Sequence, residues 1–134
     1  MFGFINKPLN KARINKFLEQ NRINFNGYGG GLSIDGLVVR EFGYLLNYIS
    51  GKTISNFYDL DKIYQNKDML LANIDKECDK NVLKEEDHLN ISHETAVYNQ
   101  KNLKNIIIKI CDFIDICKSL NLDYIEVKNS FYKG

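Results

Sequence analysis

The sequence predicts a single, mainly helical α+β domain over residues 1–134, with a small antiparallel β element and a C-terminal strand. With 134 residues, of which 44% are hydrophobic, the chain is long enough for one core and short for two ordinary domains. Apolar residues recur at helical spacing over most of the chain. In contrast, polar and apolar residues alternate around 22–35 and over 122–127, as they do in half-buried strands.

The N-terminal part predicts a helix that is followed by a two-stranded ribbon. Pro8 occupies a first-turn position, where proline is favoured, and the pattern after it predicts an amphipathic helix over 7–20 with a basic exposed side. The alternation over 22–35 predicts two short strands, and the dipeptide Asn26-Gly27 favours a hairpin turn between them.

A glycine cluster interrupts this ribbon, because five of the nine glycines lie between Gly27 and Gly36. Leu32-Ser33 follows the run where a phosphate-binding Walker loop needs Lys and then Ser or Thr, and the G-x-G-x-x-G spacing is not reproduced either. We therefore interpret the cluster as the turn of the ribbon. Tyr28 within it is a candidate contact residue, since tyrosine on a flexible glycine background is common at binding surfaces.

The middle of the chain predicts three shorter helices. Asp35 can cap the first of them, and Gly51 is a natural stop after it. Its apolar positions follow helical spacing: Val38, Val39, Phe42, Leu45, Leu46 and Ile49. Ser55 can cap a second, short helix, and Asp68 can open a third. Charged residues crowd over 75–87, and the tail of this segment is interpreted as a loop or an exposed helical end.

The C-terminal third contains the strongest helical pattern, which covers 94–120. One side of it is apolar: Leu103, Ile106, Ile107, Ile110, Ile114, Cys117 and Leu120. Asn121 is expected to make the turn into 122–127, whose alternation predicts a strand.

Charge is unevenly distributed along the chain, although the total is only +1. Residues 1–58 carry a net charge of +4, residues 59–94 carry −5 and residues 95–134 carry +2. The balanced total and the acidic middle argue against direct nucleic-acid binding, which depends on many contacts from Lys and Arg to phosphates. The acidic middle is instead suited to a basic protein partner.

Cysteine usage and hydropathy predict a reduced, cytoplasmic protein. Three cysteines, Cys78, Cys111 and Cys117, form an odd count without a CxxC pair, so a disulfide framework is a poor explanation. No apolar run approaches the roughly 20 residues of a membrane span, and the N-terminal residues lack the apolar segment of a signal peptide.

No residues form a recognisable catalytic set, and we expect no catalytic residue, no cofactor and no bound metal. His88 and His93 are five residues apart, which does not match the i, i+4 pair of helical zinc ligands. We interpret them as surface histidines, although a loop can bring both imidazoles and a carboxylate together. Acidic neighbours raise the pKa of Cys78 and weaken it as a nucleophile. An alternative, enzymatic interpretation would rest on Cys78, His88 and His93.

The overall profile is similar to that of the small cytosolic immunity proteins of bacterial contact-dependent and polymorphic toxin systems. The shared features are one short α+β domain, no catalytic set, a surface divided by charge and the residue usage of an AT-rich genome, here fifteen lysines against three arginines. This resemblance implies a non-enzymatic protein that binds one cognate toxin domain, such as a nuclease, and blocks its active site.

Under this interpretation the partner-binding residues lie in the glycine loop and the acidic segment. They are Tyr28, Glu77, Asp79, Glu85, Glu86 and Asp87. Carboxylates in the acidic segment would speed the encounter with a basic cleft and would mimic phosphate. The alternative interpretation of such a run of charges is an ordinary solvated surface. A phage-encoded inhibitor of a host defence nuclease is an alternative, because it would have nearly the same sequence features. A structural or regulatory dimer is a further alternative. The oligomeric state is left open.

Overall fold

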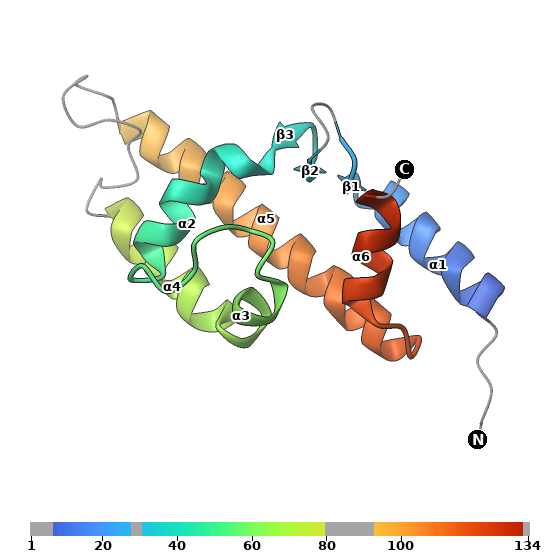
Figure 1. Cartoon of the computed structure of the whole chain (residues 1–134). Coiled ribbons are helices and arrows are strands. Elements are labelled where there is room, and N and C mark those ends of the chain that lie inside the picture. Colours follow the sequence, from blue (N-terminus) through green and yellow to red (C-terminus); the bar gives the residue numbers. More distant parts are fainter. Residues whose placement is uncertain (1–6, 28–30, 80–92, 133–134) are drawn as a thin grey trace. The chain divides into compact units, whose positions relative to one another are not determined.

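The computed structural model describes residues 7–27, 31–79 and 93–132, which are mainly helical with a small three-stranded antiparallel sheet (Figure 1). The chain divides into two compact units. The terminal unit comprises Met1–Val39 and Lys109–Gly134, and the central unit comprises Arg40–Ile108.

The terminal unit combines helices from both ends of the chain with the sheet. Its elements are α1 (Lys7–Gln20), β1 (Ile23–Asn24), β2 (Ser33–Ile34), β3 (Leu37–Val38), the last part of α5 (His93–Ser119) and α6 (Tyr124–Tyr132). The helix predicted over 7–20 is therefore confirmed as α1. Ile14 and Leu18, one turn apart on α1, are buried, and the rings of Phe25 and Phe113 meet with their centroids 4.9 Å apart.

The sheet has the order β1-β2-β3, and the predicted ribbon is its first pair of strands. Asn24 pairs with Ser33, so eight residues separate the paired positions and the connection is not a two-residue Asn-Gly turn. The Gly27 N–H donates to the Gly31 carbonyl at 2.7 Å. A Cβ at Gly27 would lie 2.7 Å from Ser33 Oγ and 3.1 Å from the Gly31 carbonyl oxygen, so a larger residue here would force Ser33 of β2 to shift.

A second hairpin follows at once, and it corrects the prediction that Asp35 caps a helix. Asp35 and Gly36 have positive φ angles of 53° and 81°, and Ile34 pairs with Leu37 across them. This is the two-residue type I′ geometry that an Asp-Gly pair favours. β3 and a short 3-10 helix, η1 (Val39–Phe42), therefore occupy the start of the predicted helix.

The central unit is helical. Its elements are α2 (Gly43–Ile49), α3 (Leu60–Gln65), α4 (Lys67–Asp79) and the first part of α5. Gly51, with a φ of 66°, ends α2 as predicted, and its N–H donates to the Tyr48 carbonyl at 3.1 Å. Asp59 caps α3 in place of the predicted Ser55, because its side chain accepts a hydrogen bond from the Lys62 N–H. Asp68 lies in the first turn of α4, close to its expected place.

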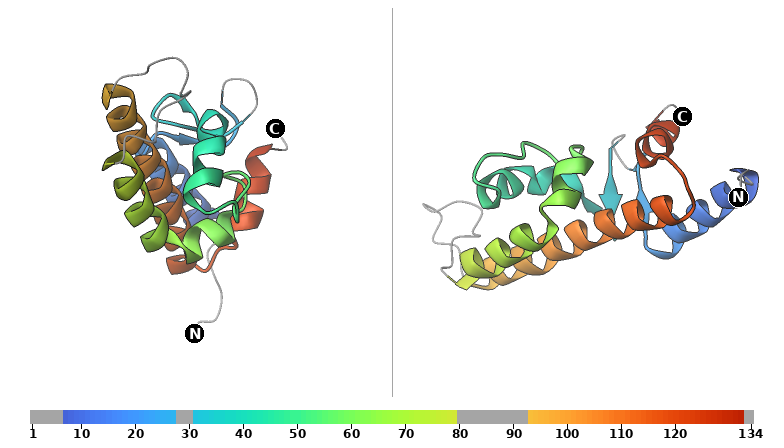
Figure 2. Two further views of the ribbon diagram at one scale, coloured as in Figure 1. Left: turned by 90° about the vertical axis from the view of Figure 1, so that its left-hand side faces the viewer. Right: turned by 90° about the horizontal axis from the view of Figure 1, so that it is seen from below.

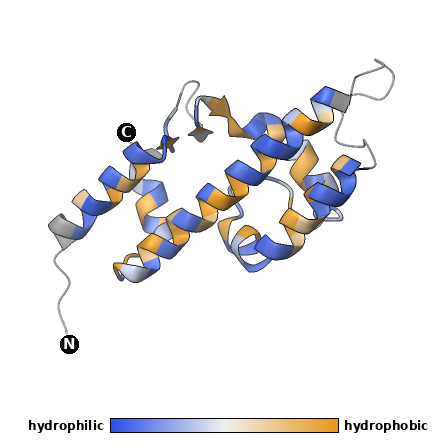
Figure 3. Ribbon diagram, turned by 180° about the vertical axis from the view of Figure 1, so that it is seen from behind, coloured by the Kyte–Doolittle hydropathy of each residue, from blue (hydrophilic) through white to orange (hydrophobic). Residues whose placement is uncertain are grey.

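The long helix predicted over 94–120 is confirmed as α5, which is 27 residues long. Hydrophobic residues recur along it between hydrophilic ones (Figure 3), and the predicted apolar residues from Leu103 to Cys117 are buried. Asn121, with a φ of 56°, ends the helix as expected, and the Leu122 N–H donates to the Cys117 carbonyl at 2.8 Å. Within the described residues, no helix is sufficiently long and apolar to span a membrane.

The strand predicted over 122–127 is wrong, because these residues lead into and form the start of α6. Asp123 Oδ1 accepts hydrogen bonds from the N–H groups of Ile125 at 2.9 Å and Glu126 at 3.4 Å, as an N-cap does. The segment is too short for its alternation to exclude a helix, since Tyr124 and Val127 also share one side of a helix at i, i+3. The hydrogen bonds to Asp123 decide between a strand and a helix in favour of the helix.

Candidate functional site

Two of the predicted partner-binding residues, Glu77 and Asp79, lie in the described part of the chain, in the last turn of α4. The others lie outside the described residues: Tyr28, Glu85, Glu86 and Asp87. His88 also lies outside them, and the side chain of His93, at the start of α5, is not described. The site is therefore built from Glu77 and its neighbours in the central unit.

Glu77 meets a tyrosine of α2. The hydroxyl of Tyr48 donates to Glu77 Oε2 at 3.4 Å, although the two residues are 29 positions apart in the sequence. Tyr48 is 51% exposed, and Tyr44, one turn earlier on α2, is 49% exposed. Sequence reasoning selected the carboxylate and missed both tyrosines. Their i, i+4 spacing, opposite the apolar residues of α2, was the signal that could have identified them.

α4 supplies the second half of this surface. Met69, Asn73 and Glu77 follow one another at i, i+4 spacing and so lie along one side of the helix. Asn73 Nδ2 donates to the carbonyl of Ile49 at 2.8 Å, which joins α4 to the end of α2 (Figure 1). Met69 is 38% exposed, and its Sδ lies 3.1 Å from Asn73 Nδ2. We call the five residues Tyr44, Tyr48, Met69, Asn73 and Glu77 the α2–α4 face.

Local helical periodicity explains why these side chains face outward. On α2 the buried residues are Leu45, Leu46 and Ile49. On α4 the buried residues are Leu70, Ile74 and Cys78. Because each helix turns its apolar side inward, Tyr44, Tyr48 and Met69 are left exposed on the central unit, and Asn73 and Glu77 are half-buried beside them.

The charge on the α2–α4 face is negative. α2, with the sequence GYLLNYI, contains no charged residue, and Glu77 contributes the one carboxylate among the five residues of the face. Lys76 is exposed next to Glu77 on α4 and flanks the face with a positive charge. Over residues 59–79, however, six acidic residues stand against three lysines. A basic partner surface would therefore be attracted to this part of the unit.

A second polar cluster joins α4 to α5, which lie side by side (Figure 2). Gln100 Nε2 donates to Asp75 Oδ1 at 2.8 Å, and the Lys104 ammonium pairs with the same oxygen. The hydrogen bond from Lys104 and then the one from Gln100 hold the pKa of Asp75 below its ordinary value. The thiol of Cys78 donates to Gln100 Oε1 at 3.3 Å. These contacts hold the two helices together.

Cys78 is poorly suited to nucleophilic chemistry. Burial raises the pKa of its thiol, and the nearby charges of Asp79 and Asp75 raise it further. Cys111 and Cys117 are also buried thiols, and burial raises the pKa of Cys117 to about 12. Among the described residues, no group of three or more His, Cys, Asp or Glu side chains is arranged to hold a metal ion.

The terminal unit contains a hollow of about 370 Å³ between the end of α1 and β1. Leu18, Ile23 and Phe25 supply its apolar lining, and Glu19 and Arg22 add opposite charges. Neither Glu77 nor Asp79, the two described residues that were predicted to bind a partner, lines this hollow. Its lining has no residue set that points to a particular ligand.

Comparisons with known proteins do not place the chain in a family. A scan against protein-family models finds no match, and searches of curated proteins and of solved structures find none either. The function is therefore argued from the residues themselves.

Proposed function

We propose that this chain is a non-enzymatic binding protein, an immunity protein that binds a cognate bacterial toxin domain, such as a nuclease, and blocks its active site. The observation that carries the proposal is the exposure of two tyrosines of α2 beside Glu77, a carboxylate from the acidic middle of the chain. Tyrosine is enriched where proteins bind one another, and carboxylates steer a basic partner into contact. A nuclease active site that binds phosphate is a partner surface of this kind.

The environment of Cys78 supports binding over catalysis. Of the alternative trio Cys78, His88 and His93, it is the residue whose side chain the structure describes. Its thiol is buried and its pKa is raised, so the thiolate that a nucleophilic mechanism needs is disfavoured.

The proposal predicts a toxin gene directly upstream of this gene, and it is tested with the toxin domain encoded there. That domain is expressed from an inducible promoter in a heterologous bacterium, with and without the chain, and colony formation is counted. We expect the chain to restore growth and the purified chain to inhibit the purified domain in a stoichiometric complex. Protection should persist in the variants Cys78→Ala, His88→Ala and His93→Ala.

Two results would contradict the proposal. One is the absence of growth protection when both proteins are expressed. The other is a gene neighbourhood without a toxin gene; phage structural genes there would instead favour the inhibitor of a host defence nuclease. Loss of protection in any of the three alanine variants that still folds would favour the enzymatic alternative.

A further inference from the structure

We infer that the α2–α4 face is the surface that docks onto the toxin domain, and that its counterpart is a basic surface with an apolar recess that receives Tyr48. This inference rests on the proposed function and adds the surface and the chemistry of the contact. Three observations carry it: the exposure of three apolar side chains on two packed helices, the contacts that position them and the sign of the charge.

The exposed apolar side chains of the face lie on both helices and are linked through its polar residues. Tyr44 and Tyr48 lie one turn apart on α2, Tyr48 reaches Glu77, and Asn73, which is bonded to the end of α2, lies beside Met69. Single exposed apolar residues are ordinary, whereas three of them on two packed helices favour an interaction site. Tyrosine and methionine are among the residues enriched at protein interfaces.

The face is held in position before any partner arrives. The bond of 2.8 Å from Asn73 to the Ile49 carbonyl fixes α2 against α4, and the longer contact of 3.4 Å from the Tyr48 hydroxyl to Glu77 orients the ring. Tyrosine has only two side-chain torsions to fix, so ordering it on binding costs little entropy. A pre-organised aromatic residue beside a carboxylate is therefore suited to act as a binding anchor.

Charge complementarity selects a basic protein over a second copy of this chain. The carboxylate of Glu77 is the charge of the face. Residues 59–79 carry three more acidic than basic residues, and one of these acids, Asp75, is paired with Lys104 of α5, so two negative charges remain in excess. Two copies that met through this face would bring like charges together, which opposes association. A cationic cleft would gain electrostatic attraction from the same residues, with a faster encounter at low salt.

The test measures association and dissociation rates of the purified upstream toxin domain on the immobilised full-length chain, at low and at high salt. Glu77→Lys should slow association, with a smaller effect at high salt. Lys76→Glu, one residue away, should speed association, because it extends the negative surface. Tyr48→Ala should raise the dissociation rate about tenfold or more, as the loss of a buried anchor does. Tyr48→Phe, which keeps the ring, should have a smaller effect.

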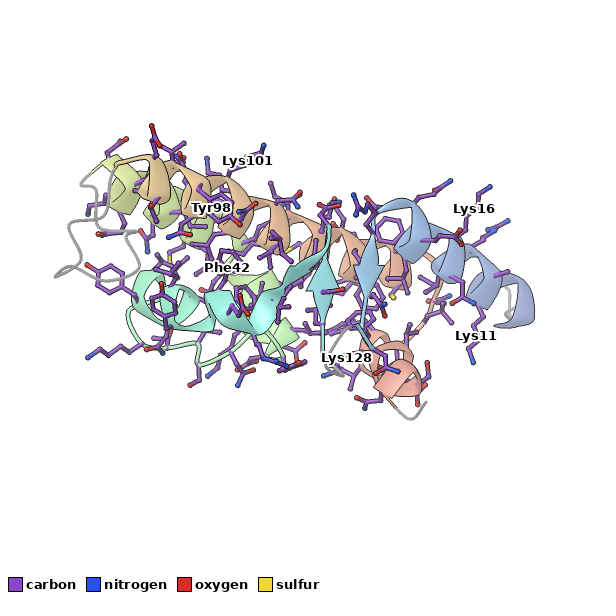
Figure 4. The ribbon with its side chains drawn as sticks, turned by 90° about the horizontal axis from the view of Figure 1, so that it is seen from above. Lys11, Lys16, Phe42, Tyr98, Lys101 and Lys128 are labelled. Carbon is purple, nitrogen blue, oxygen red and sulfur yellow. The ribbon has the colours of Figure 1, made fainter. Side chains whose placement is uncertain are left out.

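α5 offers matched controls in the same unit. Tyr98 is 54% exposed, similar to Tyr48, and projects from α5 (Figure 4). It lies two residues before Gln100, which contacts α4, and therefore about 200° away around the helix. Glu94, an exposed acid one turn before Tyr98, matches Glu77. Tyr98→Ala should bind like the wild-type chain, and Glu94→Lys should slow association less than Glu77→Lys.

The outcomes separate this inference from the proposed function. If the wild-type chain binds and protects while Tyr48→Ala and Glu77→Lys bind as tightly, the assignment of the α2–α4 face is overturned and the proposed function stands. Equal losses in Tyr98→Ala and Tyr48→Ala would also overturn it. If the wild-type chain neither binds nor protects, the proposed function fails, and this inference fails with it. Unchanged thermal unfolding and circular dichroism would exclude misfolding of Tyr48→Ala, and Tyr44→Ala provides a second variant of the same face.

Discussion

At the scale of single residues, Lys109 holds a charge in a half-buried position of the terminal unit. Its side chain is only 18% exposed, and its ammonium donates to Asp35 Oδ2 at 2.8 Å and to the Asn21 carbonyl at 2.7 Å. One cation therefore connects α5 to the β2–β3 turn and to the end of α1. A half-buried charge is tolerated here because both of its partners are oxygen atoms at hydrogen-bonding distance.

We predict that Lys109→Ala lowers the free energy of unfolding by about 2 kcal/mol, because hydrogen bonds to a charged group are lost and Asp35 keeps its charge without this partner. The measurement is urea unfolding followed by circular dichroism. Lys101→Ala is the matched control, since Lys101 is an exposed lysine on the same helix (Figure 4) and should change stability by less than about 0.5 kcal/mol. Equal effects of the two substitutions would show that the Lys109 contacts do not stabilise the fold.

At the scale of elements, turns decide where helices and strands begin. Asp35 and Gly36 adopt positive φ angles and reverse the chain after β2, although the apolar residues that follow have helical spacing. In the same way, Asn121 ends α5 with a positive φ, and Asp123 then caps α6. Turn residues therefore override the periodicity of the segments beside them when those segments are short.

Two glycines provide a matched test of this conclusion. Gly36→Ala should destabilise the protein by about 1 kcal/mol, because a Cβ is strained at its φ of 81°. Gly43→Ala, at the start of α2 with no neighbouring atom within 4 Å of the added Cβ, should stabilise it by a few tenths of a kcal/mol, about 0.5 at most. Thermal or urea unfolding measures both, and a change of the same sign in the two variants would contradict the assigned turn.

At the scale of the whole molecule, α5 is the element that both compact units contain. Its first part, up to Ile108, belongs to the central unit, and the part from Lys109 belongs to the terminal unit. The helix is continuous across this boundary, and buried residues occur on both sides of it, from Leu103 to Cys117. Each unit therefore builds part of its apolar core on the same helix.

We predict that the slowest amide hydrogen exchange in the chain falls within this buried stretch of α5, because its hydrogen bonds open only when an apolar core is exposed. Hydrogen exchange measured by NMR spectroscopy or by mass spectrometry would compare the exchange rates of α5 and α6. The side chains of α6 that the structure describes are half-buried or exposed, and its amides should exchange faster. Rapid exchange confined to residues around 108–109 would instead indicate that α5 breaks at the boundary between the units.

The accuracy of the sequence-based expectations depends on the length of each pattern. α1 and α5 were predicted closely, because their periodicity continues over several turns and needs no distant partner. β3 was missed, although Asp35-Gly36 is a known hairpin signal. Residues 122–127 were wrongly assigned to a strand, because the alternation covered only six positions. In the candidate site, the acidic composition identified Glu77, whereas Tyr44 and Tyr48 were missed because their exposure depends on which side of α2 is buried.

By itself, the sequence determined the mainly helical α+β class, the long apolar helix and the separation of charge along the chain. These properties follow from local periodicity and composition. The tertiary structure alone decided which side chains meet: Tyr48 reaches Glu77 across 29 positions, and Lys109 reaches Asp35 across 74. The physical reason is that such contacts depend on how separate helices and turns pack, and packing is a property of the folded core that no short segment of the sequence contains.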